Sequence, residues 1–230
     1  MKVLVIGCGL VGSEIARDLA RGREFEVTAF DRDAENLARL APEEGIKRVL
    51  GDVVKDISLL KEVLAEHDLA ISAVPGSIGF GVLRTVIEAG KNIVDISFMP
   101  EDPRQLDSLA KEKKVTAVVD AGVAPGLSHI LVGNAVKELE MLEKVGIYVG
   151  GLPEKPTPPW FYKAVFSPLD VIEEYIRPAR LIRDGKIFSV DPFSEIEKIE
   201  FPRIGELEAF PSDGLRTLLY SVKANTMFEK

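Results

Sequence analysis

Apolar and polar positions alternate in blocks along the first half of the chain. Short, almost uniformly apolar runs are each followed by a stretch in which apolar residues recur every three or four positions. Such runs predict strands buried on both faces, and the longer spacing predicts amphipathic helices. The predicted strands are 2–6, 26–30, 46–50, 69–74, 92–96 and 115–119. The predicted helices are 13–19, 34–40, 57–66, 82–89 and 104–113.

This alternation of strands and helices predicts an α/β fold. Short connections and uniformly apolar strands are typical of a parallel sheet that helices cover on both faces. We therefore expect a doubly wound parallel sheet with the strand order 3-2-1-4-5-6.

The pattern changes after Gly122. A helix is predicted over 127–139, an apolar run follows at 145–150, and residues 153–159 are rich in proline. Beyond them lie strand-like pieces such as 186–190, separated by turn signals. We expect a first domain over 1–124, and over 125–230 a smaller α/β domain with a mainly antiparallel sheet.

A glycine-rich loop, Gly7-Cys8-Gly9-Leu10-Val11-Gly12, joins the first predicted strand to the first predicted helix. In a loop of this kind the first glycine permits the tight turn and the second leaves room for a pyrophosphate. The third lets the helix pack closely on the strand. Free N–H groups at the helix start, at Leu10 and Val11, are expected to bind the phosphates. The context predicts a Rossmann-type dinucleotide-binding domain.

The second predicted strand is followed by Asp31, 19 residues after Gly12. A carboxylate at this position accepts hydrogen bonds from the ribose hydroxyls and repels a 2′-phosphate, so NAD is favoured over NADP. Arg32 has two interpretations, a ligand for that phosphate or a solvated surface charge. Further cofactor contacts are expected at the ends of neighbouring strands, from Asp52, Ala73, Val74, Pro75, Asp95 and Ser97.

Composition narrows the possible partners. A net charge of −8 argues against nucleic acid, and no apolar run is long enough to span a membrane. The N-terminus does not resemble a signal peptide, so we expect a cytoplasmic protein. One cysteine and two histidines provide no disulfide and no expected metal site. The chain has one glutamine and four asparagines but many charged residues, which is typical of thermophile proteins or of an ordinary charged protein.

Three further motifs narrow the choice among dinucleotide-binding proteins, which include dehydrogenases and the nucleotide-sensing domains of potassium-transport regulators. They are Ser72–Gly76 with Asp95–Pro100; Asp120-Ala-Gly-Val-Ala-Pro-Gly-Leu-Ser-His129; and Tyr148–Pro153 with Tyr162-Lys163 and Phe166–Pro168. Together they resemble the saccharopine dehydrogenase family, most closely its L-lysine 6-dehydrogenase branch, over essentially the whole chain.

The resemblance implies NAD(P)-linked hydride transfer from the amine carbon of a lysine-derived substrate, which gives an imine that water hydrolyses. In the lysine branch the product is the ε-semialdehyde, and in the saccharopine branch a secondary amine is oxidised. Saccharopine reductases often carry an acidic residue where this chain has Ala124, which favours the lysine branch. A different class, a cofactor-binding module without turnover, remains as an alternative.

Amine oxidation needs a group that accepts the amine proton and a positioned water. The candidates for catalysis are Asp120, His129 and Asp95. His129 is alternatively a capping or packing residue, and Asp95 a strand-end carboxylate that accepts local N–H groups. The resemblance places substrate contacts at Pro75, Ser97, Phe98, Tyr162, Ser212, Asp213 and Arg216. Arginine suits bidentate carboxylate recognition, although Pro211–Gly214 alone reads as a surface turn.

Relatives of this kind usually continue well past the position of Lys230. The chain is therefore expected to be either a shortened product or a short variant that completes its second sheet with another subunit. Because an exposed sheet edge is usually covered, we expect a homodimer through the second domain.

Overall fold

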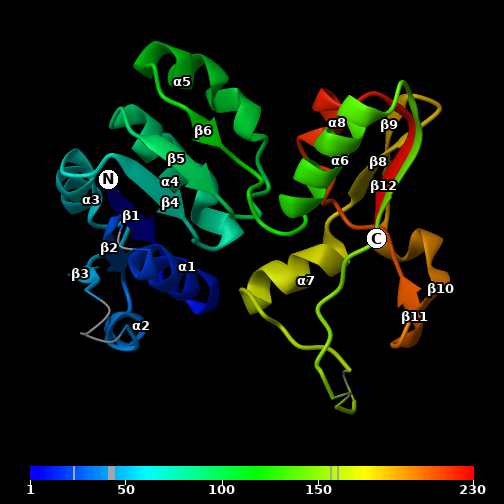
Figure 1. Ribbon diagram of the computed structural model, residues 1–230, viewed down its shortest axis with the longest axis horizontal. Coiled ribbons are helices and arrows are strands. Elements are labelled where there is room, and N and C mark those ends of the chain that lie inside the picture. Colours follow the sequence, from blue (N-terminus) through cyan, green and yellow to red (C-terminus); the bar gives the residue numbers. More distant parts are fainter. Residues whose placement is uncertain (23, 41–44, 156, 160) are drawn as a thin grey trace. The chain divides into compact units, whose positions relative to one another are not determined.

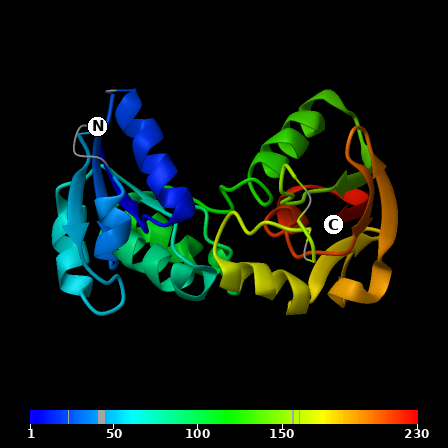
Figure 2. The ribbon, with the colours of Figure 1, turned by 90° about the horizontal axis from the view of Figure 1, so that it is seen from below.

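The computed structural model describes residues 1–22, 24–40, 45–155, 157–159 and 161–230. The chain divides into two compact units, Met1–Ala121 and Gly122–Lys230, and each is described by itself (Figures 1 and 2).

The first unit is built on a six-stranded parallel sheet with the order β3-β2-β1-β4-β5-β6. This order confirms the sequence prediction. Its strands are β1 (Lys2–Ile6), β2 (Glu26–Asp31), β3 (Lys47–Leu50), β4 (Leu69–Ser72), β5 (Asn92–Asp95) and β6 (Ala117–Val118). In the register, Ile6 lies beside both Phe30 and Ser72, so the carboxyl ends of the central strands meet at one edge.

Helices cover both faces of this sheet. They are α1 (Leu10–Arg21), α2 (Ala34–Ala38), α3 (Ile57–Ala65), α4 (Gly76–Glu88) and α5 (Asp107–Lys113), with the 3₁₀ turn η2 (Pro103–Leu106) before α5. On one face, Leu4 and Ile6 pack with residues of α3 and α4 such as Leu60 and Leu83. On the other face, Val5 packs with Ala16 of α1 and with Leu37 of α2.

Several boundaries differ from the predicted ones. Helix α4 begins at Gly76 rather than Val82, because Pro75 precedes it with a φ of −53°, which suits a helix start. The first turn of α4 is glycine-rich, so it lacks the apolar spacing by which a helix is recognised. Strand β6 is only two residues long. The side chain of Asp33 caps α2 by accepting from the Glu35 N–H, which confirms the predicted cap.

The second unit contains a four-stranded sheet with the order β7-β12-β8-β9 and a separate hairpin, β10-β11. Its strands are β7 (Leu142–Ile147), β8 (Ala179–Arg183), β9 (Lys186–Val190), β10 (Glu197–Phe201), β11 (Gly205–Ala209) and β12 (Ala224–Glu229). Its helices are α6 (Leu127–Glu138), α7 (Pro168–Ile176) and α8 (Leu218–Ser221), with the 3₁₀ turn η3 (Pro192–Glu195).

This sheet is mixed, because β12 runs parallel to β7 while β12–β8 and β8–β9 are antiparallel. The expected antiparallel character therefore holds for all pairs but one. A parallel pair needs a long crossover, and here the chain between β7 and β12 contains every other strand of the unit. Val132, Val145, Leu181, Leu215 and Met227 form its core.

Candidate functional site

The loop after β1 has the geometry of a phosphate-binding turn. Gly7 has a φ of +86°, which favours glycine. A Cβ on Gly12 would lie 1.8 Å from the Gly7 carbonyl oxygen, so only glycine allows α1 to start this close to β1. Among the described residues, a Cβ on Gly9 would meet nothing within 4 Å, and no side chain caps α1. Open space and uncapped N–H groups thus meet where a pyrophosphate would bind.

Asp31 supports this loop directly. Its carboxylate is buried and accepts hydrogen bonds from the Cys8 N–H at 2.6 Å and the Asp33 N–H at 2.7 Å. The Asn36 amide also donates to it, at 3.4 Å, so three of about four acceptor positions are used and one remains for a ribose hydroxyl. Arg32, next in sequence, is exposed. Burial, and secondarily the charge of Asp31, raises the pKa of the Cys8 thiol to about 12, so the thiol stays neutral.

Asp52 lies in the turn that follows β3. Its carboxylate accepts from the N–H groups of Val54 and Lys55, at 2.8 and 3.2 Å. These bonds, that of Val54 first, lower the pKa of Asp52. The contacts of Asp52 are therefore those of a turn-forming residue, and its expected cofactor contact stays a prediction.

The segment after β4 packs against the phosphate loop. The Ala73 N–H donates to the Ile6 carbonyl at 2.8 Å, and the Ala73 carbonyl oxygen lies 2.8 Å from where a Gly7 Cβ would be. Val74 is buried and Pro75 is exposed at the start of α4. Ala73 and Val74 thus border the loop, and their expected contacts with a dinucleotide stay a prediction.

Asp95 ends β5 and is completely buried. Its Oδ1 accepts from the Ser97 N–H at 2.9 Å and the Ser97 hydroxyl at 2.5 Å. Its Oδ2 is buried and makes no hydrogen bond of normal geometry with the described residues. Burial raises the pKa of Asp95 to about 6 against the bonds from Ser97, and the charge of buried Asp120 adds to the rise.

The structure therefore brings Asp95, Ser97 and Asp120 together, with half-buried Phe98 next in the chain. Gly79 of α4 leaves no room for a side chain, because its Cβ would lie 2.2 Å from the Ser97 hydroxyl. The contacts of Asp95 fit the interpretation of a strand-end carboxylate that orders the following loop. Asp120 has a positive φ of 53° just after β6, where the first unit ends.

His129 lies in the first turn of α6, in the second unit. Its Nδ1 accepts from the Gly126 N–H at 3.4 Å and lies 3.2 Å from the Ser128 hydroxyl. This is a capping arrangement at the helix start. The capping interpretation fits these contacts, and a catalytic role stays a prediction.

The Pro211–Gly214 segment is not an exposed turn. Ser212 donates its N–H to the Glu229 carbonyl and its hydroxyl to the Glu229 carboxylate, at 3.0 and 3.2 Å. A Cβ on Gly214 would lie 1.6 Å from the same carboxylate, so a side chain there would displace it. The segment is therefore fixed against β12. Its residue types alone predict a surface turn instead.

Asp213, within this segment, holds two arginines. Its buried carboxylate binds Arg180 through two hydrogen bonds, at 2.8 and 2.7 Å, and accepts the Arg180 N–H at 3.1 Å. The Arg216 guanidinium, also buried, lies 3.9 Å from the Asp213 Oδ2. Asp213 and Arg216, both predicted substrate contacts, therefore lie together, and Arg180 is a partner that the sequence analysis missed.

A second missed group lies on α7. Asp170, Glu174 and Arg177 follow one another at helical spacing, and burial with the charge of Asp170 raises the pKa of Glu174 to about 7. Tyr162 adjoins this group, since burial and then the charge of Glu174 raise its pKa. The sequence signal for this group is the helical spacing of its three charged residues, on the side of α7 opposite the exposed apolar residues Leu169, Ile172 and Ile176.

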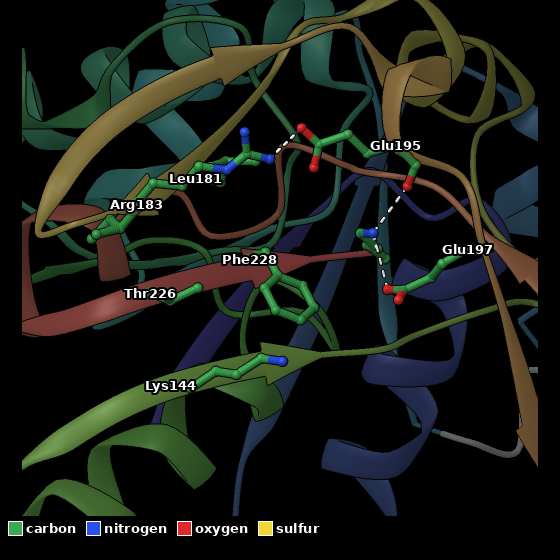
Figure 3. Close-up of a pocket in the computed structure, with 9 residues that line it drawn as sticks. Lys144, Leu181, Arg183, Glu195, Glu197, Thr226 and Phe228 are labelled. Atoms are coloured by element: carbon green, nitrogen blue, oxygen red, sulfur yellow. Dashed lines mark hydrogen bonds and ion pairs between the residues drawn. The ribbon is translucent and has the colours of Figure 1, made fainter.

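A cavity of about 230 Å³ lies on one face of the second unit's sheet, lined by residues of β7, β8 and β12 and by η3 and β10 (Figure 3). Its charges are largely paired with one another. Arg183 binds Glu195, and Lys230 Nζ lies 2.9 Å from both the Glu197 carboxylate and the Glu195 carbonyl. None of the predicted site residues lines it.

Within the described ranges, no three His, Cys, Asp or Glu side chains are grouped so as to hold a metal ion. The helices of the same ranges include none that is both long and apolar enough to cross a bilayer.

Two family models match the chain in succession. The model for the saccharopine dehydrogenase NADP-binding domain matches residues 3–118, and the model for the saccharopine dehydrogenase C-terminal domain matches residues 122–230. The chain belongs to the saccharopine dehydrogenase family.

Relatives within the saccharopine dehydrogenase family support this assignment. The chain is 30% identical to saccharopine dehydrogenase [NADP(+), L-glutamate-forming] of Saccharomyces cerevisiae over 82% of its own length and 44% of that protein. It is 28% identical to the mitochondrial alpha-aminoadipic semialdehyde synthase of Rattus norvegicus, over 82% of this chain and 21% of that protein. The solved apo saccharopine dehydrogenase (L-Glu forming) from S. cerevisiae superposes with a TM-score of 0.79 at 27% identity, covering 99% of this chain and 54% of that one.

The coverages also show how much of each relative the chain matches. The chain spans about half, or less, of the length of these saccharopine dehydrogenase relatives.

Proposed function

We propose that the chain is an NAD-dependent oxidoreductase that acts on the C–N bond of lysine or of a lysine-derived amino acid. The observation that carries the proposal is the similarity to saccharopine dehydrogenase, which extends through both units and not only through the dinucleotide-binding domain. The proposed reaction is that of an L-lysine 6-dehydrogenase. Saccharopine dehydrogenase activity is the alternative within the same chemistry, and the names of the relatives favour it.

The chain's residues have defined tasks in this proposal. A bound nicotinamide dinucleotide supplies the hydride acceptor. The uncapped start of α1 binds its pyrophosphate beside Gly9, and Ala73 and Val74 border the same loop. Arg216, held by Asp213, receives a substrate carboxylate, and Asp120 is the proposed acceptor of the amine proton.

Asp31 and Arg32 support different cofactors. A carboxylate at the end of β2 favours the free ribose hydroxyls of NAD, and Asp31 is fixed there by two backbone N–H groups. NADP is the second candidate, because the matched family model describes an NADP-binding domain and Arg32 is exposed beside the same position.

A direct assay tests the proposed function. The purified chain is mixed with L-lysine or L-saccharopine and with NAD⁺ or NADP⁺, and the reduced nicotinamide is followed by absorbance. We expect turnover with NAD⁺, with lysine giving the higher kcat/KM. Fluorescence titration with NADH and NADPH measures cofactor binding in the same preparation. Binding without turnover of either amino acid would instead favour the alternative of a non-catalytic binding module.

A further inference from the structure

Helix α7 has two chemically different sides. Leu169, Ile172 and Ile176 are exposed apolar residues at spacings of three and four, and they share one side. Asp170, Glu174 and Arg177, at spacings of four and three, share another. Asp170 is buried and the other two are partly buried, so this polar side faces the interior of the second unit.

Glu174 is held differently from three buried carboxylates elsewhere in the chain. Asp31, Asp95 and Asp213 each accept hydrogen bonds from backbone N–H groups. With the described residues, Glu174 makes no hydrogen bond and no ion pair, and it is partly buried. It is surrounded by the charges of Asp170 and Arg177, and by Tyr162 from the segment before α7.

The guanidinium group of Arg177, one helical turn further along α7, lies near this carboxylate. Burial lowers the pKa of Arg177, and the charge of Arg216 lowers it further, while Asp213 and Glu173 oppose the change. Two guanidinium groups that repel each other in a partly desolvated place are stabilised by a carboxylate ligand. The cluster therefore offers acceptors for a cation and donors for an anion in one place.

We propose that Glu174 receives an ammonium group of the amino-acid substrate, beside the guanidinium groups of Arg177 and Arg216 that receive its carboxylate. The inference rests on the proposed function, since it names how that substrate is recognised. An ammonium supplies three donors, and a charge-assisted bond is about twice as strong as a neutral one. It would replace the water that Glu174 loses through burial.

The proposal predicts a pH dependence of binding with a definite sign. Burial and Asp170 raise the pKa of Glu174 to about 7, so the carboxylate is largely protonated at pH 6 and largely ionised at pH 8. The ε-ammonium group of lysine, with an ordinary pKa of about 10.4, stays protonated over this range. Affinity for the amino acid should therefore rise from pH 6 to pH 8.

The test is isothermal titration calorimetry of the full chain with L-lysine, L-saccharopine and glutarate, a dicarboxylate without nitrogen. Glu174→Gln is compared with Glu208→Gln, which removes the same charge from an exposed position on β11. We expect Glu174→Gln to weaken amino-acid binding at pH 8 by about tenfold or more and to remove the rise between pH 6 and pH 8. Glutarate binding by Glu174→Gln, and all binding by Glu208→Gln, should match the unmodified chain.

Equal weakening of glutarate and lysine by Glu174→Gln would overturn the proposal, because it would indicate a structural defect. So would an unchanged affinity for both amino acids, or the absence of amino-acid binding by the unmodified chain. Turnover is a separate readout. If the chain binds amino acids as described but reduces no cofactor, the proposed function fails while the role of Glu174 stands.

Discussion

Carboxylates dominate the chemistry of single residues in this chain. Asp31, Asp95 and Asp213 are buried, and each accepts at least one backbone N–H, so each fixes the path of the chain next to a proposed binding group. Burial without enough hydrogen bonds has an energetic consequence, which is clearest for Asp95.

Asp95→Asn should change how stability depends on pH. The pKa of Asp95 is raised from 3.8 to about 6, so the folded state holds this proton more tightly than the unfolded state. The stability that this group contributes is complete below about pH 3 and is lost as the pH rises through 6, a total loss of about 3 kcal/mol that is complete near pH 7. Asparagine keeps the acceptor for Ser97 but cannot ionise. The difference in unfolding free energy between the two proteins, from urea denaturation, should therefore shift by this amount across pH 3–7.

Asp18→Asn is the matched control for this experiment, because the Asp18 side chain is 85% exposed on α1. Its difference from the unmodified chain should be flat over the same range. A flat difference for Asp95→Asn as well would show that Asp95 ionises as readily in the folded state as in the unfolded state, which would contradict the raised pKa.

Which of these residues the sequence predicts depends on how far apart the partners lie. Asp31 and the glycine loop are predicted because strand, loop and helix follow one another directly in the sequence. The number of residues between the loop and Asp31 is set by this single strand–helix–strand unit. Glu174, Arg177 and Arg180 are not predicted, because the nearby groups Tyr162 and Asp213 lie in other segments. Only the tertiary structure brings such groups together, and residue types alone read Pro211–Gly214 as a plain turn.

Among the secondary-structure elements, the junction of β1 and α1 has the tightest geometry. The two glycines Gly9 and Gly12 have different surroundings although they are three residues apart. Gly12 faces the Gly7 carbonyl at a distance that excludes a methyl group, whereas Gly9 faces open space. The first is therefore a requirement of packing, and the second a requirement of the ligand.

Alanine at each position separates these two requirements. Gly12→Ala should lower the stability of the first unit by about 1–3 kcal/mol, because the strand and the helix must move apart. Gly9→Ala should leave the melting temperature unchanged or slightly raised. It should weaken binding of NADH and NADPH by tenfold or more, because the methyl group occupies the space that the pyrophosphate needs. Thermal denaturation and fluorescence titration measure the two effects, and equal loss of stability in both variants would contradict the assignment.

The order of the first sheet is predicted from the sequence because its strands are uniformly apolar and follow one another with short connections. The second sheet is harder to predict. Strand β7 has only one buried residue, Val145, and no regular alternation of burial, and its parallel partner β12 comes after every other element of the unit. No local pattern encodes a pairing over such a separation, so only the mainly antiparallel character is predicted.

For the chain as a whole, oligomeric state and organisation into units are separate questions. The expected homodimer and the thermophilic and cytoplasmic assignments stay predictions. The two units, by contrast, have hydrophobic cores with no residue in common among those described. The phosphate loop belongs to the first unit, so cofactor binding there should stabilise that unit's core only.

We therefore expect two transitions in differential scanning calorimetry. A cofactor at 100 times its Kd should stabilise only the first unit, by about 2.7 kcal/mol. Leu64→Ala and Met227→Ala assign the transitions, since each removes a fully buried side chain from one unit, and each should destabilise its own unit by about 2–5 kcal/mol. A single transition that both variants and the cofactor shift equally would instead mean that the units unfold together. In that case cofactor binding at the loop would also stabilise the folded state of the residues around Glu174.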